Sequence, residues 1–189
     1  TGAAGGRVAD RLAAAGIEQR LVVSDPARAP ELTGATPVVA SSYLDYPALR
    51  VAFEGVATLF LCSARESPDR LQHHLTAAQA AVDAGVERIV YLSFLGAAAD
   101  SAFLLGRQHF LTEQFIRGTG VGFTFLRSSL YADFVPYFAG KDGVIRGPAG
   151  NGKVSWIARD DIADTVVAAL LDDSHDGQAY ANTGPEALT

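Results

Sequence analysis

Short apolar runs alternate with helical patterns along most of this 189-residue chain, and this alternation constrains its fold most strongly. The runs at 17–24, 56–63 and 88–93 are short, apolar and bounded by turn residues, which predicts buried strands. Strand–helix–strand alternation is typical of a parallel sheet, because the helix returns the chain to the starting end of the sheet. The sequence therefore predicts an α/β fold. Further strands are expected at 37–40, 123–127 and 154–157, and helices at 8–15, around 48–53, at 68–84, at 107–117 and after 159.

The chain opens with Gly2, Gly5 and Gly6 directly before its first helical pattern. Glycines allow a tight turn and a close approach of phosphate, and the free N–H groups at a helix start can hold that phosphate. The spacing departs from the usual dinucleotide fingerprint, since Val8 stands where a third glycine is expected. Two interpretations are open for this stretch: a dinucleotide site, and a helix cap after a disordered terminus.

The end of the second predicted strand carries residues that could meet an adenosine ribose. In a parallel nucleotide-binding sheet, an acid at this point binds the ribose 2′-hydroxyl, while a nearby arginine prefers a 2′-phosphate. Asp25 and Arg28 both lie here. Asp25 can equally start the turn with Pro26, which is the interpretation we favour, and Arg28 can equally be a solvated charge. On balance the residues favour NADP(H) over NAD(H).

The composition predicts a globular chain of about one domain and limits its partners. Hydrophobic residues make up 49% of the chain, and the net charge of −6 argues against a nucleic-acid partner. No apolar run is long enough to span a membrane. The single Cys62 cannot form an internal disulfide, which fits a reducing cytoplasm. Because the sequence has no methionine and begins inside a motif, we expect that an N-terminal strand and other terminal residues are missing from it.

No group of residues in the sequence predicts a metal site. His73 and His74 are adjacent on the predicted helix 68–84, so their side chains point about 100° apart and do not readily share one metal. We expect both at the surface or edge, on a helix whose apolar face carries Leu71, Leu75, Ala78 and Val82. Five glycines and a proline in 140–152 predict a mobile excursion over the site.

Six segments, met in family order, resemble the NmrA-like branch of the atypical short-chain dehydrogenases, with the bacterial NAD(P)H:quinone oxidoreductase 2 group as the most similar type. The resemblance implies a Rossmann-type doubly wound parallel sheet that binds NAD(P)H, with a small C-terminal substrate lobe. It places the cofactor-binding domain at 1–135, and part of the small lobe with late sheet elements at 136–189. The segments are Thr-Gly-Ala-Ala-Gly (1–5), Asp-Pro-Ala-Arg (25–28), Ala-Phe-Glu-Gly-Val (52–56), Val-Tyr-Leu-Ser (90–93), Phe-Leu-Arg-x-x-x-Tyr-Ala-Asp (125–133) and Ala-Arg-Asp-Asp-Ile-Ala (158–163).

The resemblance also implies where the cofactor would bind. Gly2, Gly5 and Gly6 would lie at the pyrophosphate, and Ser24 stands where the family usually has an arginine, which leaves Arg28 as the candidate for the 2′-phosphate. Ser42 stands where the family commonly has an acid near the adenine. The predicted cofactor site is completed by residues at or near the other strand ends, namely Tyr43, Cys62, Ser63 and Ser93.

The standard short-chain dehydrogenase mechanism uses a serine with a Tyr-x-x-x-Lys pair, and only the serine has a counterpart here. Ser93 is in place, but the next helix offers His109 and Glu113 at the same i, i+4 spacing. A histidine can donate a proton near neutral pH, and the glutamate could orient it, although it cannot supply the positive charge of the lysine. The alternative is an ordinary surface pair. We take Ser93, His109, Glu113 and Tyr131 as the candidate catalytic residues.

The sequence favours an NAD(P)H-dependent oxidoreductase that passes hydride to a quinone or similar flat acceptor, because such a transfer needs little proton help. Phe94, Tyr131, Phe134 and Phe138 are the candidates for an apolar wall against this acceptor, with core packing as the alternative. Two other functions are open: a regulator that senses NAD(P) without turnover and acts on a partner protein, and a biosynthetic reductase or epimerase-like enzyme. The sequence leaves open whether the protein forms a homo-oligomer.

Overall fold

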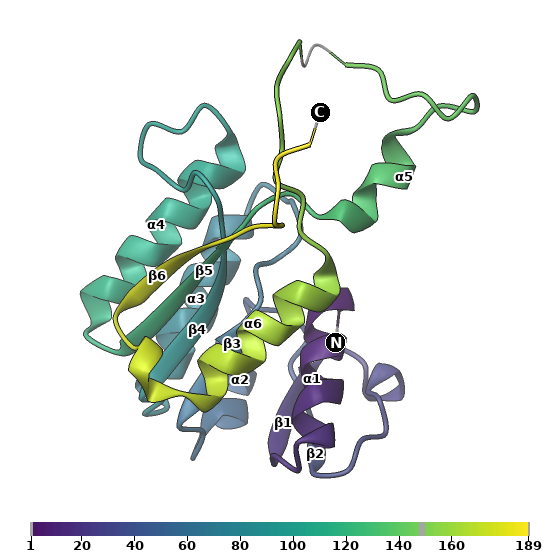
Figure 1. The fold of residues 1–189 in the computed structure, drawn as a ribbon. Helices are drawn as coiled ribbons and strands as arrows, with labels where there is room; N and C mark the ends of the chain where they lie inside the picture. The colour runs from purple at the N-terminus through teal and green to yellow at the C-terminus, as the bar shows by residue number, and fades with distance from the viewer. Residues whose placement is uncertain (1, 148–149, 189) are drawn as a thin grey trace.

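Parallel strands form the frame of the structure, and helices lie on both sides of them (Figure 1). The computed structural model describes residues 2–147 and 150–188. In one pair, β1 (Gln19–Val23) lies beside β2 (Ala35–Val39); the other sheet has the order β3 (Thr58–Leu61), β4 (Arg88–Phe94), β5 (Gly122–Ser128), β6 (Gln178–Asn182). Every strand pairing is parallel. The carboxyl ends of these strands therefore face the same edge of the molecule.

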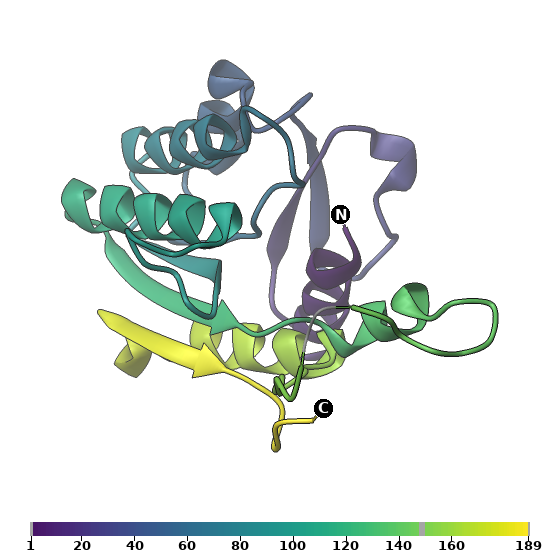
Figure 2. The same cartoon turned by 90° about the horizontal axis from the view of Figure 1, so that it is seen from above.

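The two faces of the strands pack against different helices, which gives the doubly wound arrangement (Figure 2). Side chains alternate along β4: Ile89 and Tyr91 enter the core under α2 (Tyr46–Phe53), α3 (Arg70–Asp83) and α4 (Leu104–Thr119). Val90 and Leu92 enter the opposite core, which is covered by α1 (Ala3–Ala14) and α6 (Arg159–Leu171). Because both faces are covered, the β4 side chains through Ser93 are buried, as expected for a parallel strand.

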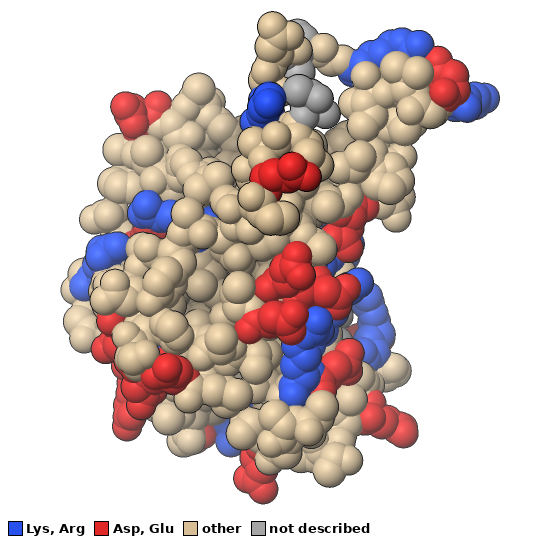
Figure 3. Space-filling view, viewed as in Figure 1, with Lys and Arg blue, Asp and Glu red and all other residues tan. Residues whose placement is uncertain are grey.

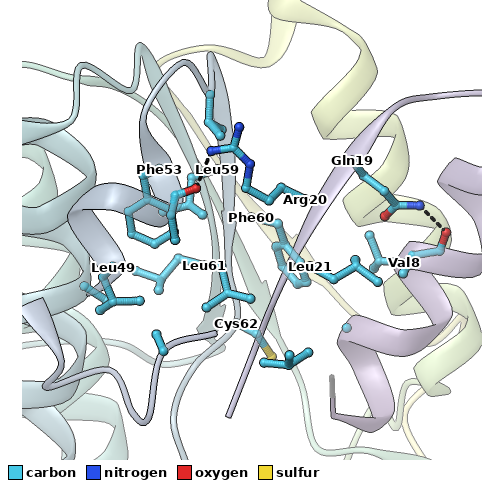
Figure 4. A pocket seen from close by; sticks show the side chains of 18 of the residues that line it. Val8, Gln19, Arg20, Leu21, Leu49, Phe53, Leu59, Phe60, Leu61 and Cys62 are labelled. Atoms are coloured by element: carbon cyan, nitrogen blue, oxygen red, sulfur yellow. Dashed lines mark hydrogen bonds between the residues drawn. The ribbon is translucent and has the colours of Figure 1, made fainter. Parts of the chain in front are cut away.

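A slot separates β1 from β3 (Figure 4). In the part of the chain that the structure describes, the edges of β1 and β3 that face this slot pair with no strand. Leu21 lines one side of the slot, and Phe60 and Leu61 line the other. The side chain of Arg20 donates from β1 to the carbonyl oxygens of Ala52 (2.6 Å) and Glu54, at the end of α2. The slot therefore lies between the two sheets and has apolar side chains on both sides.

Most predicted elements are confirmed, but three details of the prediction are wrong. Helix α1 begins at Ala3, so Gly5 and Gly6 lie inside its first turns and not in a preceding glycine turn. Residues 154–157 form only isolated bridges, from Val154 to Leu188 and from Ile157 to Tyr131. Strand β6 was not predicted, because most of its residues are exposed and show no apolar pattern.

The interpretation of α3 is also wrong. Its buried face carries Arg70 and His74 together with the alanines 77, 78, 80 and 81, while Leu71 and Leu75 are only partly buried. Small alanine side chains let the helix approach the sheet closely, so the leucine stripe does not mark the core face. His74 is 0% exposed, contrary to the expected surface position.

The segment after β5 extends away from the sheet (Figure 1). It contains η2 (Ala132–Phe134) and α5 (Val135–Phe138), where Tyr137 and Phe138 are exposed. A bridge from Ala139 to Ile145 closes the turn that follows. The predicted excursion 140–152 lies partly outside the described residues, since 148–149 are not described. Two short 3₁₀ turns complete the described elements, η1 (Pro26–Arg28) and η3 (Asp173–His175).

Charged side chains of both signs are interspersed on the face formed by α1 and α6 (Figure 3). Arg11 bonds to Asp160 and Asp164 across the two helices, and this face carries no continuous basic strip. The exclusion of nucleic acid stays a prediction. None of the helices in the described part of the chain combines the length and the hydropathy that a membrane span requires.

Candidate cofactor and acceptor site

The start of α1 and the ends of several strands line one cavity of about 1390 Å³. Its inner part is the slot between β1 and β3, where apolar side chains lie together with Gln19 and Arg20. Its mouth is different: Gly2, Gly5, Ser24, Arg28 and Ser63 all contribute to the lining. This mouth lies at the carboxyl ends of parallel strands, where open α/β sheets bind ligands.

The glycines keep the first turns of α1 open. A Cβ built on Gly2, Gly5 or Gly6 would meet no protein atom within 4 Å. These glycines therefore relieve no internal clash, and they leave space that a side chain would fill. The first N–H groups of a helix have no partner within it, so the start of α1 can bind the phosphates of a nucleotide. The residues present thus fit the pyrophosphate of a dinucleotide.

In the turn after β1, the Asp25 side chain accepts a backbone hydrogen bond, whereas the Arg28 side chain is exposed. The Asp25 carboxylate accepts a hydrogen bond from the Ala27 backbone N–H at 3.0 Å and caps η1, as expected for a turn residue. Ser24 and Arg28 are exposed beside it. The cation at this end of the strand is therefore more available to a bound phosphate than the acid.

Tyr43 and Cys62 connect the loop after β2 with the end of β3 near the cavity. The Tyr43 hydroxyl donates to the Cys62 carbonyl oxygen at 3.0 Å. Burial raises the pKa of the Cys62 thiol to about 11, and burial also raises the pKa of Tyr43. Both groups stay protonated at neutral pH, so neither presents a nucleophile or a charge to a ligand. Their position supports a role in shaping the site.

Ser93 and Glu113 form a buried group with Arg127 of β5. The Ser93 hydroxyl donates to Glu113 Oε1 at 2.6 Å, and Glu113 is 0% exposed. Arg127 Nε donates to Oε1 at 2.9 Å and Nη2 donates to Oε2 at 2.5 Å. The expected pairing of Glu113 with His109 is not formed, because each side chain bonds to other elements. This group ties α4 to β4 and β5.

His109 is held by Arg70 and Tyr91. Arg70 Nη2 lies 2.8 Å from His109 Nε2, and the Tyr91 hydroxyl lies 2.8 Å from His109 Nδ1. An arginine carries only donors, so Nε2 must accept, and the neutral ring carries its proton on Nδ1. Burial, and then the charge of Arg70, lower the pKa of His109 to about 2. The ring is therefore neutral near pH 7 in this arrangement, and the role of His109 as a proton donor stays a prediction.

His74 repeats this arrangement on the other side of Tyr91. Its Nε2 accepts a hydrogen bond from the Ala64 backbone N–H at 2.9 Å, so its proton is on Nδ1, which lies 3.0 Å from Thr112 Oγ1. Burial, and then the charges of Arg70 and His73, lower the pKa of His74 to about 3. Both buried histidines are therefore neutral links in a hydrogen-bonded network.

The candidate aromatic wall separates into two parts. Phe94 stacks on His109 with ring centroids 6.0 Å apart and covers that ring. The rings of Tyr131 and Phe134 are stacked, with centroids 5.9 Å apart and planes 7° from parallel. The Arg159 guanidinium lies 4.6 Å from the Phe134 centroid. Phe138 is 56% exposed. The stacked Tyr131–Phe134 pair presents a flat, partly exposed plate beyond the end of β5.

Sequence reasoning missed Arg70, Tyr91, Gln108 and Thr112 as parts of this site. The one available signal is the i, i+4 spacing of Arg70 and His74 on a helix face that otherwise carries alanines. Tyr91 and Thr112 give no such signal, since their partners come from elements distant in the sequence.

A doubly wound parallel sheet, with an open glycine-bearing helix start at the carboxyl ends of its strands, defines a nucleotide-binding protein of the Rossmann class. The chain belongs to the NAD(P)H-binding family, whose sequence model matches residues 1–173. This confirms the fold and the cofactor class expected from the six segments. The division of the chain at residue 135 stays a prediction.

Several characterised proteins are similar along the whole chain. An NAD(P)H azoreductase from Xenophilus azovorans is 34% identical over 193 residues, covering 100% of this chain and 67% of the relative. The crystal structure of the Escherichia coli NADPH-dependent quinone oxidoreductase QOR2 with NADPH is 31% identical with a TM-score of 0.89, covering 100% and 68%. Triphenylmethane reductase from Citrobacter sp. with NADP(H) is 29% identical with a TM-score of 0.89, covering 100% and 69%.

The transcriptional regulator NmrA shares the fold, with a TM-score of 0.81 at 20% identity. The family model and the relatives above 30% identity confirm the family resemblance inferred from the sequence. The chain spans about two thirds of the length of the azoreductase, the quinone oxidoreductase and the triphenylmethane reductase.

Proposed function

We propose that this protein is an NAD(P)H-dependent reductase that passes hydride to a flat conjugated acceptor such as a quinone or an azo dye. The observation that carries the proposal is the stacked Tyr131–Phe134 plate with Arg159 against it, beyond the carboxyl end of β5. A plate of this kind favours a planar ligand, because aromatic faces stack offset on one another. The similar azoreductase and quinone oxidoreductase carry names that refer to conjugated azo and quinone compounds, which supports the same substrate class.

The protein needs to supply little proton chemistry for this reaction. Bound NAD(P)H would supply the hydride, and the acceptor then takes up one proton to complete its two-electron reduction. Ser93 and His109 are both committed to internal hydrogen bonds, so neither is placed to deliver that proton. Burial raises the pKa of Tyr131 to about 12, and its hydroxyl therefore stays protonated and can donate a hydrogen bond to an acceptor oxygen. We assign Tyr131 this role, with water as the source of the net proton.

The cofactor site of the proposal uses Gly2, Gly5 and Gly6 for the pyrophosphate and Arg28 for a 2′-phosphate. The exposed guanidinium of Arg28 and the occupied carboxylate of Asp25 support NADPH over NADH. Ser24 and Ser63 line the same mouth. This assignment places the charge of the cofactor at the start of α1 and its ribose end near η1.

The test measures oxidation of NADPH and NADH by the full-length protein with planar quinones and an azo dye, and with a non-planar ketone as a control acceptor. We expect oxidation that depends on the planar acceptors and is faster with NADPH. The variant Tyr131→Leu should raise KM for the quinone several-fold and leave the Kd for NADPH within twofold. Tyr131→Phe keeps the plate and loses the hydroxyl, so it should affect kcat more than KM.

Two results would contradict the proposal. Tight NADPH binding without oxidation by any acceptor would favour a cofactor sensor, and the search would turn to a protein partner. Equal turnover of the ketone and the quinones would favour a carbonyl reductase and would remove the role assigned to the plate.

A further inference from the structure

The loop after β3 is held from within by two side chains of α3. His74 Nε2 accepts from the backbone N–H of Ala64 at 2.9 Å, and Arg70 Nε donates to the carbonyl oxygen of Ala64 at 2.8 Å. Both backbone groups of one residue are therefore satisfied by side chains. Ser63, Ala64 and Arg65 line the mouth of the cavity that the glycines of α1 also line.

Arg70 is itself fixed in position by α4. Its guanidinium donates to Gln108 Oε1 at 3.2 Å and to His109 Nε2 at 2.8 Å, and the residue is 3% exposed. The tautomers forced on His109 and His74 make this network self-consistent, because each ring accepts at Nε2 and donates at Nδ1. Each side chain of the network is thus oriented by a hydrogen bond to another part of the chain.

Stability alone does not explain a guanidinium at this place. Within residues 2–147 and 150–188, no carboxylate lies at ion-pair distance from Arg70. Burying a charge without an opposite partner is costly, and a well-packed apolar residue would be cheaper. A bound nucleotide brings negative charge to the crevice that this loop lines, and so lowers the cost of the buried cation.

We propose that Arg70 and His74 are positioning residues for the cofactor: they clamp the backbone of Ala64 and so hold the loop 63–65 in its binding conformation, and the charge of Arg70 favours the anionic ligand. The inference rests on the cofactor binding that the proposed function requires, and not on the acceptor. It concerns residues of α3, whereas the proposed pyrophosphate site lies at the start of α1.

The test compares the Kd of NADPH for the full-length wild-type protein and the variants Arg70→Gln, Arg70→Lys and Arg50→Gln. Arg50 is an exposed arginine of α2 that pairs with Glu54, so its variant controls for the loss of one positive charge. We expect Arg70→Gln to raise the Kd at least tenfold. Arg70→Lys should restore the affinity only in part, since lysine keeps the positive charge but lacks the planar guanidinium that donates to several acceptors at once. Arg50→Gln should stay within twofold.

Comparing the Kd for NADPH with the KM for the acceptor distinguishes a positioning role from a general structural role. With NADPH saturating, KM for the acceptor should stay within twofold in Arg70→Gln. A folded Arg70→Gln protein with an unchanged Kd, or one in which Kd and acceptor KM rise equally, would overturn the inference. Failure of the wild-type protein to bind NADPH would instead overturn the proposed function.

A measurement on the wild-type protein covers the case in which Arg70→Gln does not fold. Hydrogen exchange should show that the Ala64 amide is protected before NADPH is added, and nitrogen-15 spectra at pH 7 should show both His74 and His109 with the proton on Nδ1. An unprotected Ala64 amide, or a proton on Nε2 of either ring, would overturn the clamp.

Discussion

The Ser93–Glu113–Arg127 group predicts an asymmetry between two substitutions that break the same ion pair. Glu113 is 0% exposed, whereas the side chain of Arg127 is 32% exposed. In Glu113→Gln, the arginine that loses its partner can still reach water. In Arg127→Met, the carboxylate that loses its partner is fully enclosed. We therefore expect Arg127→Met to be the more destabilising change.

The burial of the two partners sets the size of each effect. Glu113→Gln loses charge-assisted hydrogen bonds, and we expect the free energy of unfolding to fall by about 1–3 kcal/mol. Arg127→Met leaves an unpaired buried charge, for which about 3–5 kcal/mol is typical. For a chain of this size the corresponding losses in Tm are roughly 5 °C and roughly 10 °C. The loss of unfolding free energy in the double variant should be smaller than the sum of the two single losses by at least about 1 kcal/mol, because both changes remove the same interaction.

Urea unfolding of the wild-type protein and four variants, namely Glu113→Gln, Arg127→Met, the double variant and Arg127→Lys, followed by circular dichroism, measures these differences. Arg127→Lys is the matched control, since it keeps the charge and should cost the least. A loss in Glu113→Gln equal to or larger than that in Arg127→Met would show that the enclosed carboxylate does not dominate the energetics. Additive losses in the double variant would show that the two residues do not act as a pair.

Three further predictions concern the histidines and the cofactor site. The pKa values of His109 (about 2) and His74 (about 3) lie below the unfolded value of about 6.5, so their stabilisation is present above pH 6.5 and is lost as the pH falls towards 3. Between pH 7 and pH 5.5, urea unfolding should show that the free energy of unfolding falls by about 1 kcal/mol per histidine. This fall should be smaller in His109→Asn than in the wild type; an equal fall in both proteins would count against the network. Arg28→Gln should raise the Kd for NADPH about tenfold and leave that for NADH within twofold, and equal changes would remove Arg28 from the 2′-phosphate site. Gly5→Val should raise the Kd for both cofactors at least tenfold with little change in Tm, since no protein atom lies within 4 Å of the new Cβ; unchanged titrations would place the phosphates elsewhere.

The sequence predicted the class of this fold because that class depends on local patterns. Apolar runs such as 88–93 are buried on both faces, and the helix starting at Arg159 follows from its acids and its apolar spacing. The capping role of Asp25 was also predictable, since Asp-Pro turns act within a few residues. Strand β6 was not predicted, because an exposed edge strand needs no apolar pattern and is fixed by its pairing with β5.

The candidate site shows where sequence reasoning ends. His109 and Glu113 have the spacing of a pair on one helix face, but Arg70 and Tyr91 bind the first, while Ser93 and Arg127 bind the second. Spacing states which side chains can meet, and it does not state which other elements offer better partners.

By itself the sequence determined the order and type of most elements, because propensity, turns and caps act over a few residues. The resemblance of six segments to a known family, more than the glycines of α1, indicated the nucleotide-binding class. The tertiary structure alone decided that Arg70 and His74 face inward, that the two buried histidines are neutral, and that the backbone of Ala64 is clamped. These features depend on how closely α3 and α4 approach the sheet, and on the low dielectric that their packing creates around the polar groups.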